Sequence, residues 1–244
     1  MLFSVSELND LLNIQPKGVL HVGAHLAEES HDYQLHNWGK TYWVEAQPDK
    51  VHSMQKTLDP SINEVIHCVV WSESGIEMQF NLASNGESSS LLKFGSHSKT
   101  YPKIKYLEQI KVTTSTLAEV LPDNAQCDFL NLDLQGVELQ ALIGLGSKIS
   151  NFKWIYTEVN NKEVYENCTL VNALDDHLNP LGFSRAYSRW VIGAGWGDAL
   201  YVRDDQVKVS IMKIIMLRAK TVLFYLRQFS SLGKKRVMNI FGVA

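Results

Sequence analysis

Short apolar runs alternate with longer mixed segments from about residue 15 to residue 203. The runs are too brief for ordinary helices and are rich in β-branched and aromatic residues, which is typical of buried strands. They lie at residues 18–25, 41–45, 65–71, 112–116, 127–133 and 154–159. Helical spacing between most of them predicts βαβ crossovers, and therefore an α/β fold on a doubly wound, mostly parallel sheet.

Other segments complete this pattern. Ser4 and Glu7 form a capping-box sequence ahead of a short first helix, and further helices are expected at 49–58, 137–143 and 171–178. Residues 190–192 and 198–202 predict a closing antiparallel pair. Between residues 72 and 111 the pattern changes, and we expect a hairpin strand at 76–82 followed by a long mobile loop over a site.

The stretch Gly18-Val-Leu-His-Val-Gly-Ala-His-Leu-Ala-Glu28 predicts a strand, a tight turn and a helix start. Such a junction points backbone N–H groups and a helix dipole at one place, and a glycine there lets a ligand approach the main chain. We therefore predict a nucleotide-like ligand at Gly23, Ala24 and His25. The alternative is an ordinary packing turn.

Polar or aromatic residues stand at the ends of the next predicted strands, where open α/β sheets bind their ligands. Glu45 follows the Gly23 turn by about twenty residues, the place of a carboxylate that holds both ribose hydroxyls of a nucleoside. Trp71, Asp133 and Glu158 end later strands. The alternatives are a solvated loop carboxylate for Glu45 and a helix N-cap for Asp133.

Composition narrows the class of protein. The 244 residues, 45% of them hydrophobic, suffice for one domain with or without an appendage. The three cysteines are far apart and form no Cys-x-x-Cys, so we expect neither a disulfide framework nor structural zinc, and a reducing, cytoplasmic location. The first residues do not have the pattern of a secretory signal, and no apolar run is long enough to span a bilayer.

Charge divides the chain in two. Eight of the 23 Lys and Arg residues follow Asp205 and none of the 26 acidic residues does, so residues 1–205 carry −11 and the tail +8. The acidic body argues against broad nucleic-acid binding. Residues 206–244 predict a basic amphipathic helix whose apolar face could pack on its own domain, on a partner protein or on an anionic membrane. In the last case the protein would be peripheral on the cytoplasmic membrane face.

Histidines offer a metal site as another interpretation. His21, His25 and Glu28 lie close in sequence, with His31 and His36 nearby. The first pair straddles a predicted strand and turn, so the two side chains need not converge as they would on a helix. We therefore predict no metal among these residues.

The motifs together resemble the FkbM family of class I S-adenosylmethionine-dependent O-methyltransferases, over roughly residues 15–203. The resemblance rests on Gly18-Val-Leu-His-Val-Gly-Ala-His25, Tyr42-Trp-Val-Glu-Ala-Gln-Pro48, Ser88-Ser-Ser-Leu-Leu92 and, most specifically, Asp128-Phe-Leu-Asn-Leu-Asp-Leu-Gln-Gly-Val-Glu138. It implies a Rossmann-like, seven-stranded sheet with an antiparallel last strand, in a domain of residues 1–205, and an acceptor hydroxyl on a saccharide, glycan or polyketide.

The resemblance also suggests which residues form the site. The family commonly begins its glycine motif with an acid where this chain has His21, so Asp133 becomes the better candidate to meet the methionine amine. We expect the catalytic acids to be Asp133, Glu158 and Asp198. The expected cofactor-binding residues are Gly23, Ala24, His25, Glu45, Ala46, Trp71, Ser72, Asp133 and Gln135.

Three alternatives remain at this point. A divalent cation such as Mg²⁺ could be held by Asp133, Glu158 and Asn160, as in catechol-type O-methyltransferases. A dehydrogenase that uses a nicotinamide dinucleotide (NAD) is disfavoured, because the residues after Gly23 lack the Gly-x-Gly-x-x-Gly pattern that seats a pyrophosphate. A nucleoside-binding module that has lost its catalytic activity would leave the polar strand ends unexplained.

Overall fold

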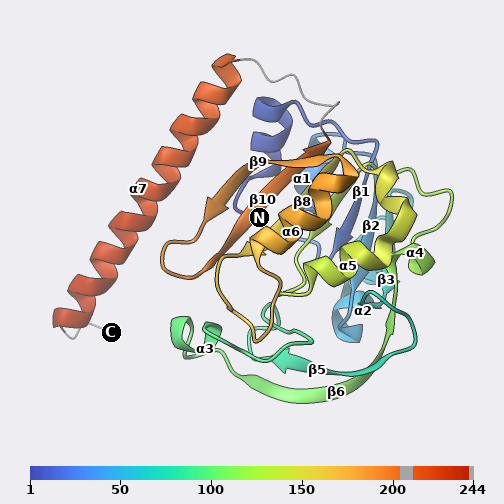
Figure 1. Ribbon diagram of the computed structural model, residues 1–244, viewed down its shortest axis with the longest axis horizontal. Helices are drawn as coiled ribbons and strands as arrows, with labels where there is room; N and C mark the ends of the chain where they lie inside the picture. The colour runs from blue at the N-terminus through green and yellow to red at the C-terminus, as the bar shows by residue number, and fades with distance from the viewer. Residues whose placement is uncertain (204–210, 242–244) are drawn as a thin grey trace.

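The computed structural model describes residues 1–203 and 211–241, and a seven-stranded sheet forms its centre (Figure 1). The strand order is β3-β2-β1-β7-β8-β10-β9, and β10 runs antiparallel to both of its neighbours. The strands are β1 (Gly18–Val22), β2 (Lys40–Glu45), β3 (Asn63–His67), β7 (Phe129–Leu132), β8 (Trp154–Asn160), β9 (Phe183–Trp190) and β10 (Trp196–Arg203). The predicted mostly parallel sheet with an antiparallel last strand is confirmed.

Helices connect and cover the strands. The chain begins with a short π-helix, η1 (Glu7–Leu11), and its expected capping box forms: the Ser4 amide donates to Glu7 Oε2 at 3.0 Å, and the Glu7 amide donates to Ser4 Oγ at 3.2 Å. The others are α1 (Ser30–Leu35), α2 (Pro48–Thr57), α3 (His97–Thr100), α4 (Leu117–Val120), α5 (Glu138–Leu145), η2 (Gly146–Asn151), α6 (Val171–Leu178), η3 (Asn179–Leu181) and α7 (Ile211–Phe241). Among the residues that the structure describes, no helix is long and apolar enough to cross a membrane.

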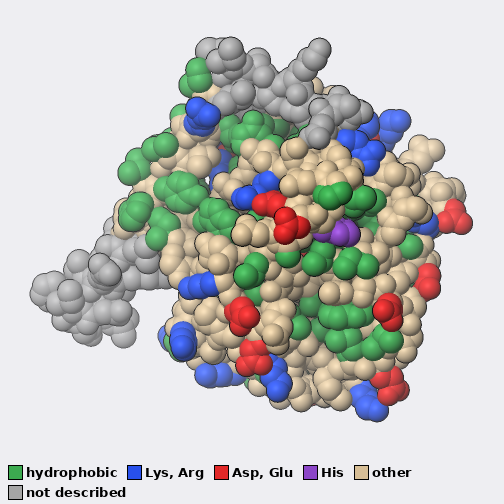
Figure 2. Space-filling model, in the orientation of Figure 1, with side chains coloured by type: hydrophobic (Ala, Val, Ile, Leu, Met, Phe, Trp, Pro, Cys, Tyr) green, Lys and Arg blue, Asp and Glu red, His purple; other side chains and the backbone are tan. Residues whose placement is uncertain are grey.

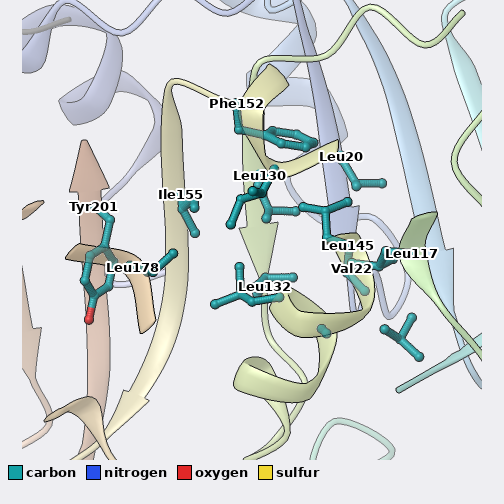
Figure 3. Close-up of a cluster of buried hydrophobic side chains, with 14 of the residues drawn as sticks. Leu20, Val22, Leu117, Leu130, Leu132, Leu145, Phe152, Ile155, Leu178 and Tyr201 are labelled. Carbon is teal, nitrogen blue, oxygen red and sulfur yellow. The ribbon is translucent and has the colours of Figure 1, made fainter. Parts of the chain in front are cut away.

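The core lies on both faces of the sheet because neighbouring residues of a strand point to opposite sides. Leu20 and Val22 face the cluster that includes α5 and α6 (Figure 3). Val19 faces the second cluster, which includes Trp38, Trp43 and η1. Each fully buried aliphatic side chain contributes roughly 1.5–3 kcal/mol, so these two layers hold the strand ends in fixed positions.

The segment between β3 and β7 differs from the sequence prediction. The expected strand at 65–71 divides at Cys68, whose amide donates to the Glu45 carbonyl at 3.0 Å. After this point β4 (Val69–Val70) pairs with β6 (Tyr106–Ser115), which also pairs with β5 (Glu77–Ala83) in a separate three-stranded sheet. The strand β6 starts six residues before the position expected from the sequence. Its first half is largely exposed and lacks an apolar run, so the hydrophobic pattern did not reveal it.

The loop after β5 is also more firmly held than its composition suggests. Ser88, Ser89 and Ser90 are all buried. The Ser89 hydroxyl donates to the Gly86 carbonyl at 2.9 Å, and the Ser90 hydroxyl donates to the Gln135 carbonyl at 2.9 Å. The expectation of a mobile loop overlooked these contacts, because the partners of the serines are backbone groups that no sequence pattern identifies.

Helix α7 packs along the outer edge of the sheet, beside β9 and η1 (Figure 1). The Gln228 side chain accepts from the Ile192 amide at 2.8 Å and donates to the Trp190 carbonyl at 3.0 Å. The Tyr225 hydroxyl accepts from the Trp190 amide at 3.2 Å. Polar side chains of α7 therefore pair the backbone groups at the end of β9, an edge strand, and just beyond it.

Candidate functional site

A cavity of about 570 Å³ opens at the carboxyl ends of β1, β2, β7 and β8, within the size range of small-molecule sites. Figure 1 shows β5 and β6 crossing beyond these strand ends. Most of the residues predicted for the site line the cavity, whereas Trp71 and Ser72 do not. The lining includes Gly23, Ala24, His25, Glu45, Ala46, Asp133, Gln135, Glu158 and Asp198.

The Gly23 turn has a different physical basis from the one the sequence suggested. Gly23 has φ +82°, and a Cβ there would lie 1.8 Å from the backbone oxygen of Asp133. The amides of Gly23 and Ala24 both donate to the Val44 carbonyl, at 2.9 and 3.0 Å. Helix α1 begins only at Ser30. The glycine is thus required by the close approach of two backbones, and the turn's N–H groups are already paired.

Glu45 is fixed in orientation at the end of β2. Its Oε2 accepts from the His25 amide and its Oε1 from the Gln47 amide, both at 2.8 Å, and the residue is buried. Each carboxylate oxygen keeps a further acceptor site. The two backbone bonds preorganise a negative charge beside the cavity, which suits a pair of ligand hydroxyls.

Gln135 joins two of the predicted catalytic acids. Its Nε2 donates to Asp133 Oδ1 at 2.5 Å and to Glu158 Oε2 at 3.2 Å. Asp133 is exposed at the wall of the cavity. The protein packed around its carboxyl, and then the nearby Asp198 carboxylate, raise the pKa of Asp133 to about 6. Burial, and then the charge of Asp133, raises the pKa of Glu158 well above its usual range. At neutral pH the pair therefore favours one negative charge over two.

Asp198 lies directly opposite Glu158 in the ladder between β8 and β10. Its Oδ2 accepts from the Leu2 amide at 2.6 Å and from the Tyr156 hydroxyl. Burial raises the pKa of the Asp198 carboxyl. One of its oxygens is thus engaged in holding the N-terminal segment, which leaves Asp133 and Glu158 as the more available acids.

Two further residues were missed by the sequence analysis: Tyr165, which lines the cavity, and Glu138, which lies behind its wall. The Tyr165 hydroxyl donates to Gln135 Oε1 at 2.5 Å. Glu138 is fully buried, and its Oε1 accepts from the amides of Leu134 and Gly136, both at 3.0 Å. Burial raises the pKa of Glu138 to about 7. Glu138 belongs to the most specific sequence motif, so its place in the motif was visible, but its contact with the turn backbone was not.

The histidines do not gather into a cluster of metal-ligand side chains among the residues that the structure describes. His21 is buried, its ring lies 3.3 Å from the Tyr33 hydroxyl, and burial lowers its pKa, which favours the neutral ring. His25 Nδ1 contacts Glu28 Oε1 at 2.5 Å. Within the described ranges, no three or more His, Cys, Asp or Glu side chains group as metal ligands. Asn160, a proposed ligand for a divalent ion, is fully buried and does not line the cavity, so it is not placed to share an ion there with Asp133 and Glu158.

Comparison with known proteins connects this geometry to a family. Residues 21–185 match the family described as "Methyltransferase FkbM domain". The sequence has no match among curated proteins.

Solved structures share the fold at low identity. A methyltransferase from Aquifex aeolicus dependent on S-adenosylmethionine (SAM) is 13% identical with a TM-score of 0.46, covering 83% of this chain and 90% of that one. Magnesium protoporphyrin IX methyltransferase from Synechocystis is 11% identical with a TM-score of 0.45, covering 83% and 76%. TrmK from M. capricolum, bound to S-adenosylhomocysteine, is 9% identical with a TM-score of 0.44, covering 84% and 71%.

Proposed function

The chain belongs to the FkbM methyltransferase family, and from this premise we propose that it transfers the methyl group of S-adenosylmethionine to a hydroxyl of a saccharide or glycan. Membership of this family supports methyl transfer with S-adenosylmethionine as the donor. The proposal adds that the acceptor atom is a hydroxyl oxygen, that the acceptor is a saccharide or glycan, and which residues act in the reaction. The observation that carries it is the pair of carboxyls, exposed Asp133 and buried Glu158, joined by Gln135 at the wall of the cavity.

Two acids suit the two polar ends of the cofactor. Glu45, held by two backbone amides, accepts from the ribose hydroxyls. Asp133, with a pKa of about 6, is ionised at neutral pH and binds the methionine ammonium. The adenosine then lies near the Gly23 turn, where Ala24 and Ala46 also line the cavity.

Glu158 is suited to take the proton of the acceptor. In the reaction the bond from sulfur to the methyl carbon breaks, a bond from the acceptor oxygen to that carbon forms, and S-adenosylhomocysteine leaves. The hydroxyl proton goes to the Glu158 carboxylate. The positive ammonium and sulfonium groups of the bound cofactor lower the pKa of Glu158, which favours the carboxylate form that a general base needs.

The far side of the cavity carries the groups that a polyhydroxylated acceptor needs. Trp196, Tyr101 and Tyr165 line it, together with the carboxyl of Glu158. Trp196 Nε1 donates to the Tyr101 hydroxyl at 3.0 Å, which fixes both rings. Flat aromatic surfaces beside a few oriented hydrogen-bonding groups favour a saccharide over a wholly apolar acceptor.

Two variants separate binding from chemistry. Glu158→Gln should leave S-adenosylhomocysteine binding unchanged in calorimetry and lower kcat by roughly 10²–10⁴-fold with an active glycan acceptor. Asp133→Asn should weaken cofactor binding as well as turnover. Asp123→Asn, on an exposed acid paired with Lys148 away from the cavity, is the matched control.

The acceptor is tested with methyl-labelled donor against glycans, small phenols and RNA. Transfer of the labelled methyl group to a glycan by the parent protein, and loss of this transfer in Glu158→Gln, would support the proposal. Label in RNA or phenol instead would overturn the saccharide assignment, and parental turnover in Glu158→Gln would remove this residue as the base. Cofactor binding without any transfer would support the non-catalytic alternative.

A further inference from the structure

Helix α7 presents an unexpected face to the rest of the protein. The side chains that contact the domain are Leu217, which is fully buried in the core beside η1, and the polar or aromatic residues one to three turns later. Besides the contacts of Tyr225 and Gln228 with β9, Arg189 of β9 reaches Thr221 Oγ1 at 3.4 Å and lies over the Phe224 ring at 5.4 Å. These residues recur at helical spacing and form one side of α7.

The opposite side of α7 is apolar and exposed. Six of its large hydrophobic side chains are each 51–61% exposed, which sets this helix apart from the packed body. Figure 2 shows hydrophobic side chains gathered over the described middle of the helix, at the left of the view. We call this set the apolar stripe of α7, and it consists of Ile215, Met216, Val222, Leu223, Leu226 and Phe229.

Basic residues border the stripe on both sides. At 3.6 residues per turn, Arg218 falls on one flank and Lys220 and Arg227 fall on the other. All three are exposed. The wider tail, residues 206–244, has eight basic residues and no acid. An apolar stripe between two cationic flanks is the pattern of a helix that lies in the plane of a membrane surface.

We propose that α7 docks the protein on an anionic lipid surface, with the apolar stripe inserted at the boundary between headgroups and acyl chains. The flanking cations then meet the lipid phosphates. The body of residues 1–205, with its net charge of −11, faces away from the membrane. The sequence allowed three surfaces on which the apolar face of this helix packs: its own domain, a partner protein or a membrane. Because the apolar stripe is exposed, it does not pack against its own domain.

A second copy of the chain fits the stripe less well. Symmetric pairing of two stripes would bring Arg218, Lys220 and Arg227 of both copies together, and like charges in close register are repulsive. The stripe also runs along a straight helix (Figure 1), and its exposed side chains form a ridge rather than a groove into which a partner helix would insert. A membrane surface satisfies both the shape and the charge.

The test is flotation of the full-length protein with two kinds of vesicle. One contains phosphatidylcholine with phosphatidylserine and the other phosphatidylcholine alone. We expect binding to the anionic vesicles and much weaker binding to the neutral ones. The double variant Lys220→Gln with Arg227→Gln should lower anionic binding roughly 25-fold, because each Lys or Arg near such a surface contributes about fivefold.

The apolar component has its own variants. Leu226→Gln with Phe229→Gln should abolish binding, whereas Leu107→Gln, which alters a 74% exposed residue on β6, should not change it. Thermal unfolding checks that each variant is folded. Absence of anionic binding, or equal binding to both vesicles, would overturn the proposal. So would a dimer in sedimentation velocity that Leu226→Gln with Phe229→Gln dissociates, since the stripe would then hold a second copy.

Discussion

The Tyr165 hydroxyl determines which way the Gln135 amide faces. It donates to Gln135 Oε1 at 2.5 Å, so the amide nitrogen must point to Asp133 and Glu158. Gln135 itself has φ +54°, a conformation that is uncommon for residues other than glycine. The backbone strain and the tyrosine together aim one N–H₂ group at both acids, which keeps the buried Glu158 carboxyl beside the exposed Asp133 carboxyl.

Tyr165→Phe should therefore alter the proton-transfer step. Without its hydroxyl partner the amide no longer holds a donor against Glu158, and the pKa of this acid rises further. We expect the acid limb of kcat/KM against pH to move to higher pH. Tyr106→Phe is the control, because the Tyr106 hydroxyl donates to the Leu92 carbonyl at 2.8 Å and does not line the cavity. An unshifted profile in Tyr165→Phe would show that Tyr165 only packs.

Glu138 should make the fold less stable as pH rises. Its pKa is raised by burial from 4.5 to about 7, so the folded state binds a proton that the unfolded state releases. The free energy of unfolding then falls between about pH 4.5 and pH 7, by up to about 3 kcal/mol. Glu138→Gln should flatten this slope in urea titrations, while Glu77→Gln, at an exposed site, should not. Equal slopes in the parent and Glu138→Gln would contradict this assignment.

Much of the fold was predictable because buried strands have local signatures. The helix 171–178, the end of β2 at Glu45 and the place of Glu158 near the end of β8 follow from hydrophobic runs of definite length. The strand β6 was only partly predicted, since its first half faces solvent and is stabilised by pairing with β5 rather than by burial. The extent of such a strand depends on pairing with a strand that is distant in sequence, and one amino-acid sequence does not reveal that partner.

The site was predictable as a set of positions but not as a set of contacts. Topology brings the ends of parallel strands together, so Glu45, Asp133 and Glu158 were found from strand ends alone. Tyr165 comes from the segment between β8 and α6, where no period or motif marks it. The role of Gly23 was misjudged because the atom it avoids belongs to Asp133, more than a hundred residues later.

Glu45 offers a test of cofactor placement that Gly23 does not. A larger residue at Gly23 would collide with the backbone of Asp133, directly after β7, and disturb the fold itself. Glu45→Gln removes the charge and one acceptor, and a charge-assisted hydrogen bond is worth roughly 1.5–3 kcal/mol. We expect the Kd for S-adenosylhomocysteine to rise at least tenfold in calorimetry. Glu64→Gln, on the neighbouring strand and paired with Lys40, should bind like the parent.

The docking of α7 predicts a sharp contrast between two leucines of the same helix. Leu217 is 1% exposed within the core beside η1, whereas Leu223 is 53% exposed in the apolar stripe. Leu217→Ala leaves a cavity and should lower the free energy of unfolding by about 2–5 kcal/mol. Leu223→Ala should change it by less than about 0.5 kcal/mol, as at other surface positions. Chemical denaturation of both variants measures the difference, and equal stability would mean that α7 does not pack on the domain in solution.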